Sequence, residues 1–274
     1  MSKRTVLAVA LIGGAALLAL WLSGLAADTE PGAADPGEVA VRPPGTGVLI
    51  ERLRRTNLLN GEEIHRRLGP GGDMSSLDDP EPVRRWHASL PRDTEVCGVR
   101  FAGPERVDYR LQTFPDRDSA LAAGFVVTHR HHCGACSSLR DLANYLAQPD
   151  LTTPARRCAR RWTAAGIEEC FRKEIGFGER CAATWTRNAL RTRRRCAATC
   201  IAHYGLWNLV TNDIRAPNTD EHGNLNPCLR CDERVSGPGF QYAAGRTRRS
   251  SGLTSAIARP AAEIYPVDHR LYFR

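Results

Sequence analysis

The segment HRHHCGAC contains the residues whose types and spacing are best suited to chemistry. Cys133 and Cys136 form a CxxC pair, and His131 and His132 stand directly before it. A thiolate attacks disulfide bonds, and positive charge beside a cysteine lowers the pKa of its thiol. Protonated His131 or His132 would supply that charge. The segment therefore predicts a thiol–disulfide site in which Cys133 attacks and Cys136 resolves the mixed disulfide.

The elements expected around this pair would position it for that role. Alternating apolar and polar residues predict a half-buried strand at 107–111, a short helix follows at 115–123, and 125–128 form a buried strand. A helix with serines at its start is expected over 137–147. Cys133 would then lie near the positive end of a helix dipole, which also lowers the pKa of a thiol.

A CxxC pair between a strand and a helix resembles the active site of the thioredoxin-like oxidoreductases. The resemblance covers the strand–CGAC–helix segment and implies a reducible, exposed bond between Cys133 and Cys136. The sequence departs from that family because no aromatic residue directly precedes Cys133 and no downstream proline can be assigned as the family's cis-proline. The alternative is that both cysteines belong to structural disulfides.

The CGAC sequence also partly resembles the papain-type signature C-G-[SA]-C-[WY], whose second cysteine is the nucleophile. This resemblance implies a free Cys136 with His269 as its base. Ser137 stands where the signature has an aromatic residue, and Arg130 stands where a glutamine is expected. A cysteine hydrolase is therefore a third hypothesis.

Metal binding is another use of the same cysteines. Cys133 and Cys136 could combine with a second CxxC pair, Cys228 and Cys231, in a four-thiolate zinc site, or in a mixed Cys/His site that also uses His129, His131 or His132. Exported cysteines oxidise more often than they bind metal. We therefore expect no cofactor, with zinc at these four residues as the alternative.

The run GRTRRSSG could bind an anion. Arg246, Arg248, Arg249 and Ser250 lie before a possible short helix at 253–258. Guanidinium groups and free helix N–H groups together suit phosphate, sulfate or carboxylate. The alternative is a solvated basic loop in a chain that is rich in arginine.

The N-terminal region predicts export. Residues 5–27 contain no charge and follow Lys3 and Arg4, which is typical of a segment whose downstream chain crosses the membrane. We expect 1–27 to be a membrane anchor or a cleaved signal peptide, 28–47 to be a flexible linker and 48–274 to be a cysteine-rich extracytoplasmic domain. The domain would face the periplasm or the extracellular space, and it would be secreted if the signal is cleaved.

The composition agrees with that location. The ten cysteines are an even number and suit a disulfide framework in an oxidising compartment. The formal net charge of +8 is spread along the chain, so nucleic acid is not expected as a partner. The expected partners are the membrane through residues 5–27 and either a protein thiol or disulfide or an anionic ligand.

The expected fold class is α+β and α-rich, with disulfides bracing a helical hairpin over about 154–203. The hairpin turns at 176–178, and cysteines equidistant from that turn would face each other. This geometry predicts the disulfides Cys158–Cys196 and Cys170–Cys181. Residues 208–274 are expected to form loops and short elements.

Two functional hypotheses therefore lead. The first is a membrane-tethered thiol–disulfide redox protein, which would be the enzymatic case. The second is a non-catalytic, disulfide-stabilised binding or scaffold domain that uses the basic loop, and it predicts that all ten cysteines are locked in buried bridges.

Overall fold

The protein is a mixed structure of helices and one β-sheet. The computed structural model describes residues 45–61, 80–90 and 93–273. All of these belong to the second of two units, 42–274. The predicted membrane segment at 5–27 and most of the predicted linker lie outside the described residues. Within those residues, no helix has the length and apolarity needed to cross a bilayer.

The sheet has four strands in the order β1-β3-β2-β4. They are β1 (Asn57–Leu58), β2 (Val96–Phe101), β3 (Asp108–Phe114) and β4 (Val126–Arg130). β2 is antiparallel to both β3 and β4, and β1 is parallel to β3. Helix α4 (Arg117–Ala122) joins β3 to β4, with Asp116 accepting a hydrogen bond from the Ser119 N–H as its N-cap. The predicted strand–helix–strand unit is confirmed, whereas β2 was not predicted.

Helices make up most of the rest of the described chain. The α-helices are α2 (Thr46–Arg54), α3 (Pro80–Ser89), α5 (Leu139–Ala147), α6 (Thr152–Ala159), α7 (Ala164–Cys170), α8 (Glu179–Tyr204), α9 (Leu206–Thr211), α10 (Pro227–Val235) and α11 (Gly237–Ala244). A π-helical turn, η6 (Phe171–Ile175), follows α7. The 3-10 turns are η7 (Arg249–Ser251), η8 (Ala261–Glu263) and η9 (His269–Phe273).

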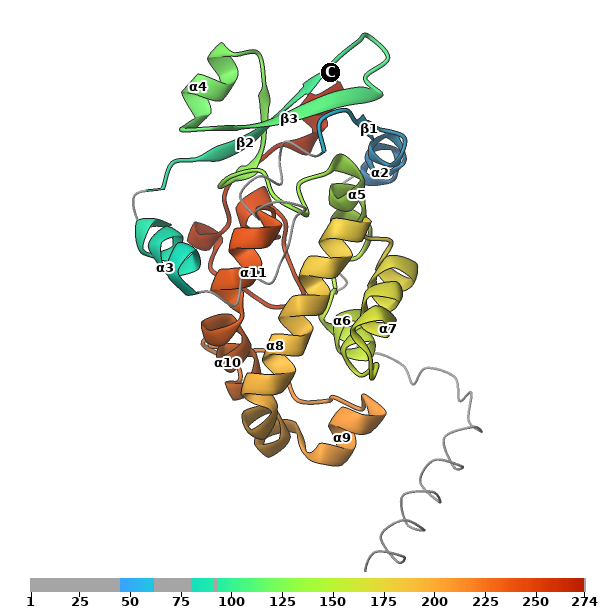
Figure 1. Ribbon diagram of the computed structural model, residues 1–274, viewed down its shortest axis with the longest axis vertical. Helices are drawn as coiled ribbons and strands as arrows, with labels where there is room; N and C mark the ends of the chain where they lie inside the picture. Colours follow the sequence, from blue (N-terminus) through green and yellow to red (C-terminus); the bar gives the residue numbers. More distant parts are fainter. Residues whose placement is uncertain (1–44, 62–79, 91–92, 274) are drawn as a thin grey trace, which may run out of the picture. The chain divides into compact units, whose positions relative to one another are not determined.

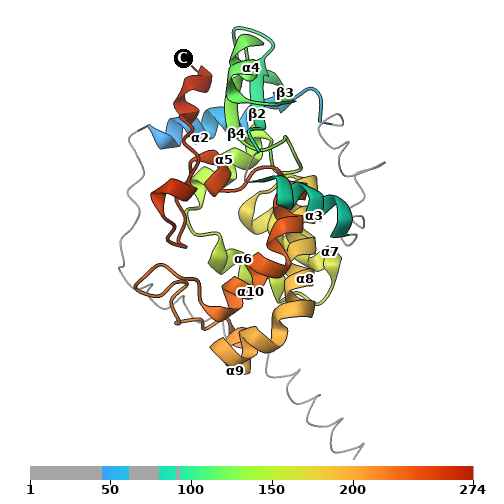
Figure 2. The same ribbon diagram turned by 90° about the vertical axis from the view of Figure 1, so that its left-hand side faces the viewer.

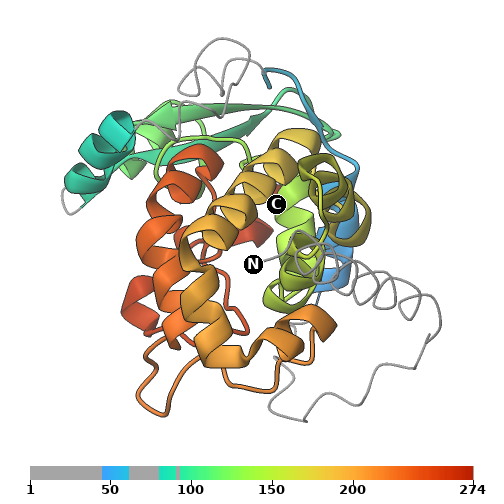
Figure 3. The same cartoon turned by 60° about the horizontal axis from the view of Figure 1, so that its bottom comes forward.

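Helix α8 packs against the largest number of other helices. It lies between α10 and α11 on one side and α6 and α7 on the other, as Figures 1 and 3 both show. The sheet lies toward the N-terminal end of α8, and α9 follows its C-terminal end (Figure 1). Figure 2 shows α3 on the same side of α8 as α10 and α11.

The hairpin prediction is correct for its turn and its second helix. Gly176 has a φ of 86°, a left-handed conformation that favours glycine, and it ends the first arm. The first arm is not one helix, because it breaks at 160–163 between α6 and α7. The Thr163 hydroxyl accepts a hydrogen bond from the Gly166 N–H and starts the new helix.

All ten cysteines form five disulfides, and none is free. The pairs are Cys97–Cys133, Cys136–Cys181, Cys158–Cys170, Cys196–Cys231 and Cys200–Cys228. They support the expected disulfide framework.

The two disulfides predicted from the hairpin, Cys158–Cys196 and Cys170–Cys181, are wrong. The break at 160–163 turns α7 back against α6, so Cys158 reaches Cys170 within the first arm. Cys196 faces α10, a helix that was not predicted, and pairs there with Cys231. Cys181 faces the start of α5.

We predict that the disulfide with the longer loop contributes more to stability. Cys136–Cys181 closes a sequence separation of 45, and Cys158–Cys170 closes one of 12. In the loop-entropy model this difference is worth about 1 kcal/mol. Replacing both Cys136 and Cys181 by Ala should therefore lower the free energy of unfolding by that much more than replacing both Cys158 and Cys170. Urea titrations in oxidising buffer would measure both values, and an equal loss would contradict the prediction.

Candidate functional site

The CGAC segment is a packing junction between the β4–α5 connection and the end of α11. The Ala135 N–H donates to the Ala243 carbonyl and the Cys136 N–H donates to the Ala244 carbonyl, each at 2.9 Å. A Cβ atom on Gly134 would lie 2.7 Å from the Ala243 oxygen. Gly134 is therefore required because two backbone segments meet there without room for a side chain.

The two CGAC cysteines are bonded to different partners and are buried. Cys133 is 2% exposed and pairs with Cys97 of β2, and Cys136 is 0% exposed and pairs with Cys181 of α8. A thioredoxin-like site requires an exposed bond between Cys133 and Cys136. The structure instead has each cysteine in a separate, buried bond. The expected position before a helix is confirmed, because Ser138 caps α5 by accepting from the Asp141 N–H.

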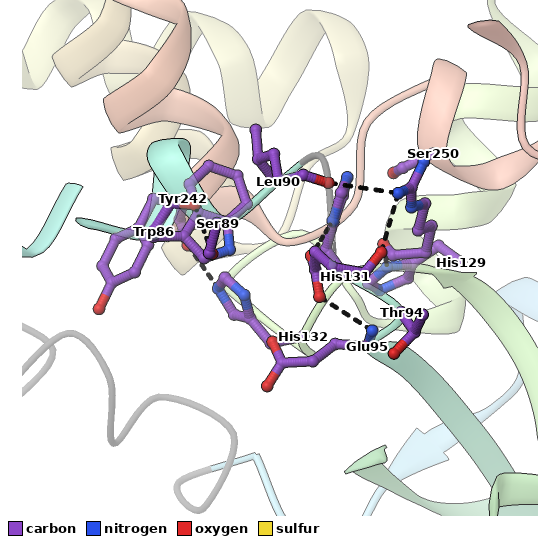
Figure 4. Close-up of polar contacts among 12 residues, drawn as sticks. Trp86, Ser89, Leu90, Thr94, Glu95, His129, His131, His132, Tyr242 and Ser250 are labelled. Atoms are coloured by element: carbon purple, nitrogen blue, oxygen red, sulfur yellow. Dashed lines mark hydrogen bonds and ion pairs between the residues drawn. The ribbon is translucent and has the colours of Figure 1, made fainter. Parts of the chain in front are cut away.

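His131 forms a hydrogen bond to a carboxylate beside this junction (Figure 4). Its Nδ1 lies 2.6 Å from Oδ2 of Asp93, and its backbone adopts a left-handed φ of 73°. Burial alone raises the pKa of Asp93, but the hydrogen bonds from His131 and the Glu95 N–H outweigh it and lower that pKa below its usual value. The pair orients His131, but its neighbour Cys133 is oxidised and offers no thiol for the imidazole to activate.

His132 packs inside an aromatic cluster. Its Nε2 donates to the Tyr242 carbonyl at 2.7 Å, and its ring meets the edge of Trp86 at 5.8 Å between centroids. Figure 4 shows Trp86 and Tyr242 beside it. His132 is 1% exposed. These contacts position α3 and α11 rather than a reactive thiol.

His129 and Ser137 form a fully buried serine–histidine pair. The Nε2 of His129 lies 2.8 Å from the Ser137 Oγ, and its Nδ1 lies 2.8 Å from the Arg130 carbonyl. Burial and the nearby Arg246 charge lower the pKa of His129 well below its usual value. The neutral ring therefore donates from Nδ1 and accepts the Ser137 hydroxyl at Nε2. Because both side chains are 0% exposed, the pair braces the fold and meets no substrate.

The papain-type expectation is contradicted at both of its residues. Cys136 is bonded to Cys181 and is not free. The Nε2–H of His269 donates to the Ser251 carbonyl, and its Nδ1 accepts from the Tyr272 hydroxyl, each at 2.7 Å. Burial and the Arg246 charge lower the pKa of His269 to about 4. It is a buried neutral ring.

Arg246, the first residue of the predicted anion site, is entirely buried. It is 0% exposed and donates to the carbonyls of Cys136, Ser137 and Thr128 and to the Thr128 hydroxyl. Its guanidinium thus serves backbone oxygens of β4 and the CGAC segment. The prediction of an anion ligand is wrong for Arg246, because its donors are already used inside the protein.

The other members of that loop are also engaged internally. Arg248 donates to the Tyr145 and Gln148 carbonyls, and Arg249 pairs with Glu263. The Ser250 Oγ accepts from the Thr247 N–H. The short helix predicted at 253–258 is absent, and the turn η7 ends before it, at Ser251. The 245–252 segment therefore has a structural role, because its side chains hydrogen-bond to other parts of the protein.

The alternative zinc site is not assembled. Cys133 and Cys136 belong to the main core, and Cys228 and Cys231 belong to a separate cluster at the α8–α10 contact. All four are oxidised, and a disulfide sulfur is not the thiolate that zinc requires. In the described chain, the Sγ atoms of Cys158 and Cys170 and a Glu174 carboxylate oxygen also lie within 4.8 Å of one another. Those sulfurs too form a disulfide.

An open cleft of about 490 Å³ lies at the C-terminal end of α8. Gly205, with a φ of 84°, ends α8 and redirects the chain into α9. Buried in the cleft wall, Nε2 of His203 has no hydrogen-bond partner among the described residues. The lining residues are His203, Tyr204, Asn208, Asp213, Ile214, Arg215 and Ala216. Sequence reasoning missed this cleft because residues 208–216, which form much of its lining, offered only loop signals.

One part of the chain matches a known protein family. Residues 164–267 match the model of a family of unknown function, DUF8771. No curated protein and no solved structure matches the chain. The matched region begins with α7 and includes the cleft and the α8–α10 disulfides, but not the CGAC segment.

We predict that Gly134→Ala destabilises the fold strongly. The new Cβ would overlap the backbone of both Ala243 and Gly245, neither of which can rotate away as a flexible side chain would. Overpacking of this kind lowers the free energy of unfolding by about 1–3 kcal/mol. Gly103→Ala is the control because nothing lies within 4 Å of the position that its Cβ would take. Thermal and urea unfolding would contradict the prediction if both variants behaved alike.

A pH dependence follows from His269. Its folded pKa of about 4 lies below the unfolded value of 6.5, so unfolding takes up a proton between those values. Its contribution to stability is full above pH 6.5 and decreases as the pH falls toward 4. His269→Gln should therefore reduce the stability difference between about pH 7 and about pH 5 by roughly 2 kcal/mol. Urea titrations at both pH values measure this, and an unchanged difference would contradict it.

Proposed function

We propose that this protein is a non-catalytic, disulfide-braced binding domain that works outside the cytoplasm and binds its partner at the α8–α9 end. One observation carries the proposal. Cys133 and Cys136 are locked in separate buried bridges, whereas the α8–α9 end presents an open cleft to solvent.

Five disulfides without a free cysteine indicate an oxidising, extracytoplasmic environment. Tethering to a membrane through residues 5–27 is part of the proposal and rests on the sequence. A tether would keep the domain at the membrane surface, so a binding surface of modest affinity would suffice because the effective concentration is high.

The composition of the cleft supports binding rather than catalysis. Asn208 offers an amide, and Asp213 and Arg215 form an ion pair at 3.0 Å. Ile214 and Ala216 add an apolar wall. This mixture suits a partner with both polar and apolar parts. His203 and Asp213 both line the cleft, but no hydrogen bond joins them in the described chain as the acid–base pair of a hydrolytic site would require.

The competing function is thiol–disulfide exchange at CGAC. It would require Cys133 to leave Cys97 and Cys136 to leave Cys181, so that a Cys133–Cys136 bond could form and open reversibly. Cys97 and Cys181 would then either bond to each other or be reduced to thiols by an external dithiol. Both existing bonds lie in the main hydrophobic core, where an attacking thiolate has no access.

Disulfide mapping under graded reduction tests the proposal. We expect all ten cysteines of the native protein to resist alkylation and mass spectrometry to recover the five pairs named above. A Cys133–Cys136 bond that appears in mild reductant would overturn the binding proposal in favour of exchange.

A matched pair of variants adds an activity readout to this test. One variant replaces Cys97 and Cys133 by Ala, and the other replaces Cys200 and Cys228 by Ala. If the protein is a binding domain, neither variant differs from the native chain in the rate at which reduced glutathione reduces a model disulfide in its presence. An oxidoreductase would lose that activity in the first variant alone.

A further inference from the structure

Helix α9 turns an apolar face outward. Leu206, Trp207 and Val210 are 60%, 66% and 55% exposed. At about 100° per residue these three share one side of the helix. The other side faces the protein, because Leu209 packs on the α8–α10 cluster and the Asn208 side chain donates to the Tyr204 carbonyl.

A second exposed tryptophan lies in a connection that is hydrogen-bonded to α9. Trp162 is 95% exposed and stands in the α6–α7 connection. The Arg160 side chain in this connection donates to the Val210 carbonyl at 2.6 Å, and Arg193 of α8 donates to the Arg161 carbonyl at 3.0 Å. These bonds hold the α6–α7 connection beside α9.

We define the α9 patch as the exposed side chains of Trp162, Ile201, Leu206, Trp207 and Val210. They are half of the ten large hydrophobic side chains that are exposed in the described residues. Single exposed apolar residues are normal, but a cluster at one end marks a surface that contacts another apolar phase.

Arginines of α8 and of the α6–α7 connection lie beside this patch. Arg160, Arg161, Arg193 and Arg194 are exposed, and Arg194 lies two turns before Ile201 on the same face of α8. Two nearby carboxylates are already neutralised, since Asp213 pairs with Arg215 and Glu169 with Lys173. The patch is therefore apolar at its centre and cationic at its edge.

We propose that the α9 patch docks on an anionic lipid bilayer. The tryptophans and aliphatic side chains would enter the boundary between headgroups and acyl chains, where Trp is enriched. Arg161 and Arg194, whose side chains are not the ones that hold the α6–α7 connection, would bind lipid phosphates through bidentate hydrogen bonds. This inference rests on the proposed binding function and names its partner.

The lengths of the elements allow this contact in a tethered chain. Helix α8 has 26 residues, which gives a length of about 39 Å. Its first end contacts α5, where the Gly178 N–H donates to Asp141, and α5 packs on α2; its other end leads into α9. The described chain thus starts at the end of α8 opposite to the patch. A stretch the length of residues 28–44 reaches at most roughly 60 Å, more than the length of α8.

Quenching of tryptophan fluorescence by brominated lipid tests the proposal on the full chain. The chain has five tryptophans, and Trp21→Phe removes the one in the predicted membrane segment. We expect quenching of this variant in vesicles of brominated phosphatidylcholine with phosphatidylglycerol, and at least a twofold smaller effect in vesicles without the anionic lipid. Adding Trp162→Phe and Trp207→Phe should abolish it, because Trp86 and Trp185 lie within the protein.

Charge-reversal variants test the role of the arginines. Arg161→Glu with Arg194→Glu should reduce the quenching severalfold, whereas Arg117→Glu on α4, an exposed control away from the patch, should leave it unchanged. Leu206→Ser with Val210→Ser should likewise reduce it, and Leu121→Ser on α4, which is 52% exposed, should not.

Three results would overturn the proposal. The first is no quenching of Trp162 or Trp207 in any vesicle, and the second is equal quenching without anionic lipid. The third is loss of acrylamide access to these tryptophans as protein concentration rises, which would assign the patch to a second copy of the chain. The disulfide map is an independent measurement. If the five disulfides are intact but no quenching is seen, only the lipid-docking inference is contradicted. If a Cys133–Cys136 bond appears and quenching is seen, only the binding proposal is contradicted.

Discussion

The buried guanidinium of Arg246 holds together the parts of the chain on which the rest of the structure depends. It reaches Thr128 in the middle of β4 and the carbonyls of Cys136 and Ser137 just before α5. Burial lowers the pKa of Arg246, and the nearby Asp141 carboxylate is among the groups that oppose this effect. A buried charge is tolerated only when its donors are satisfied, and all of these contacts are to oxygen acceptors. The sheet, the CGAC segment and α11 are therefore fixed around one cation.

This constraint explains why the residues best suited to chemistry do none of it here. The CGAC backbone is pinned by Arg246 on one side and by the α11 carbonyls on the other, and its cysteines point to partners in β2 and α8. The serine and histidine next to it are hydrogen-bonded to each other in the core. The CGAC motif has the spacing of an active site, but its contacts connect elements of the fold.

The sequence predicted elements whose signals are local. Strand β3 alternates in polarity, α5 has a serine cap, and α8 follows a glycine turn, and all three were predicted. The start of α10 also carries a local signal, an Asn226 cap before Pro227 at the first turn, which would have revealed that helix. The break after α6 contains neither glycine nor proline, so only the Thr163 cap marks it.

Tertiary features could not be predicted from such local patterns, because the disulfide partners depend on which helices pack together. The burial of Arg246 likewise depends on acceptors 109 to 118 residues away in the sequence. A run of arginines has the same composition whether its side chains lie in solvent or are buried in the core. The composition of this run therefore could not show whether it forms an anion-binding site.

The α9 end is held in place by two covalent bonds together with the packing of Leu209 on the α8–α10 cluster. Cys196–Cys231 and Cys200–Cys228 join α8 to α10, and the chain between them, which includes α9 and the cleft, is a loop closed at its base. Because this base is covalent, the loop does not need to bury α9 to remain in place. An exposed apolar helix normally threatens solubility and stability. Here the two bridges carry the stability, and Leu206 and Trp207 are left free to contact a partner.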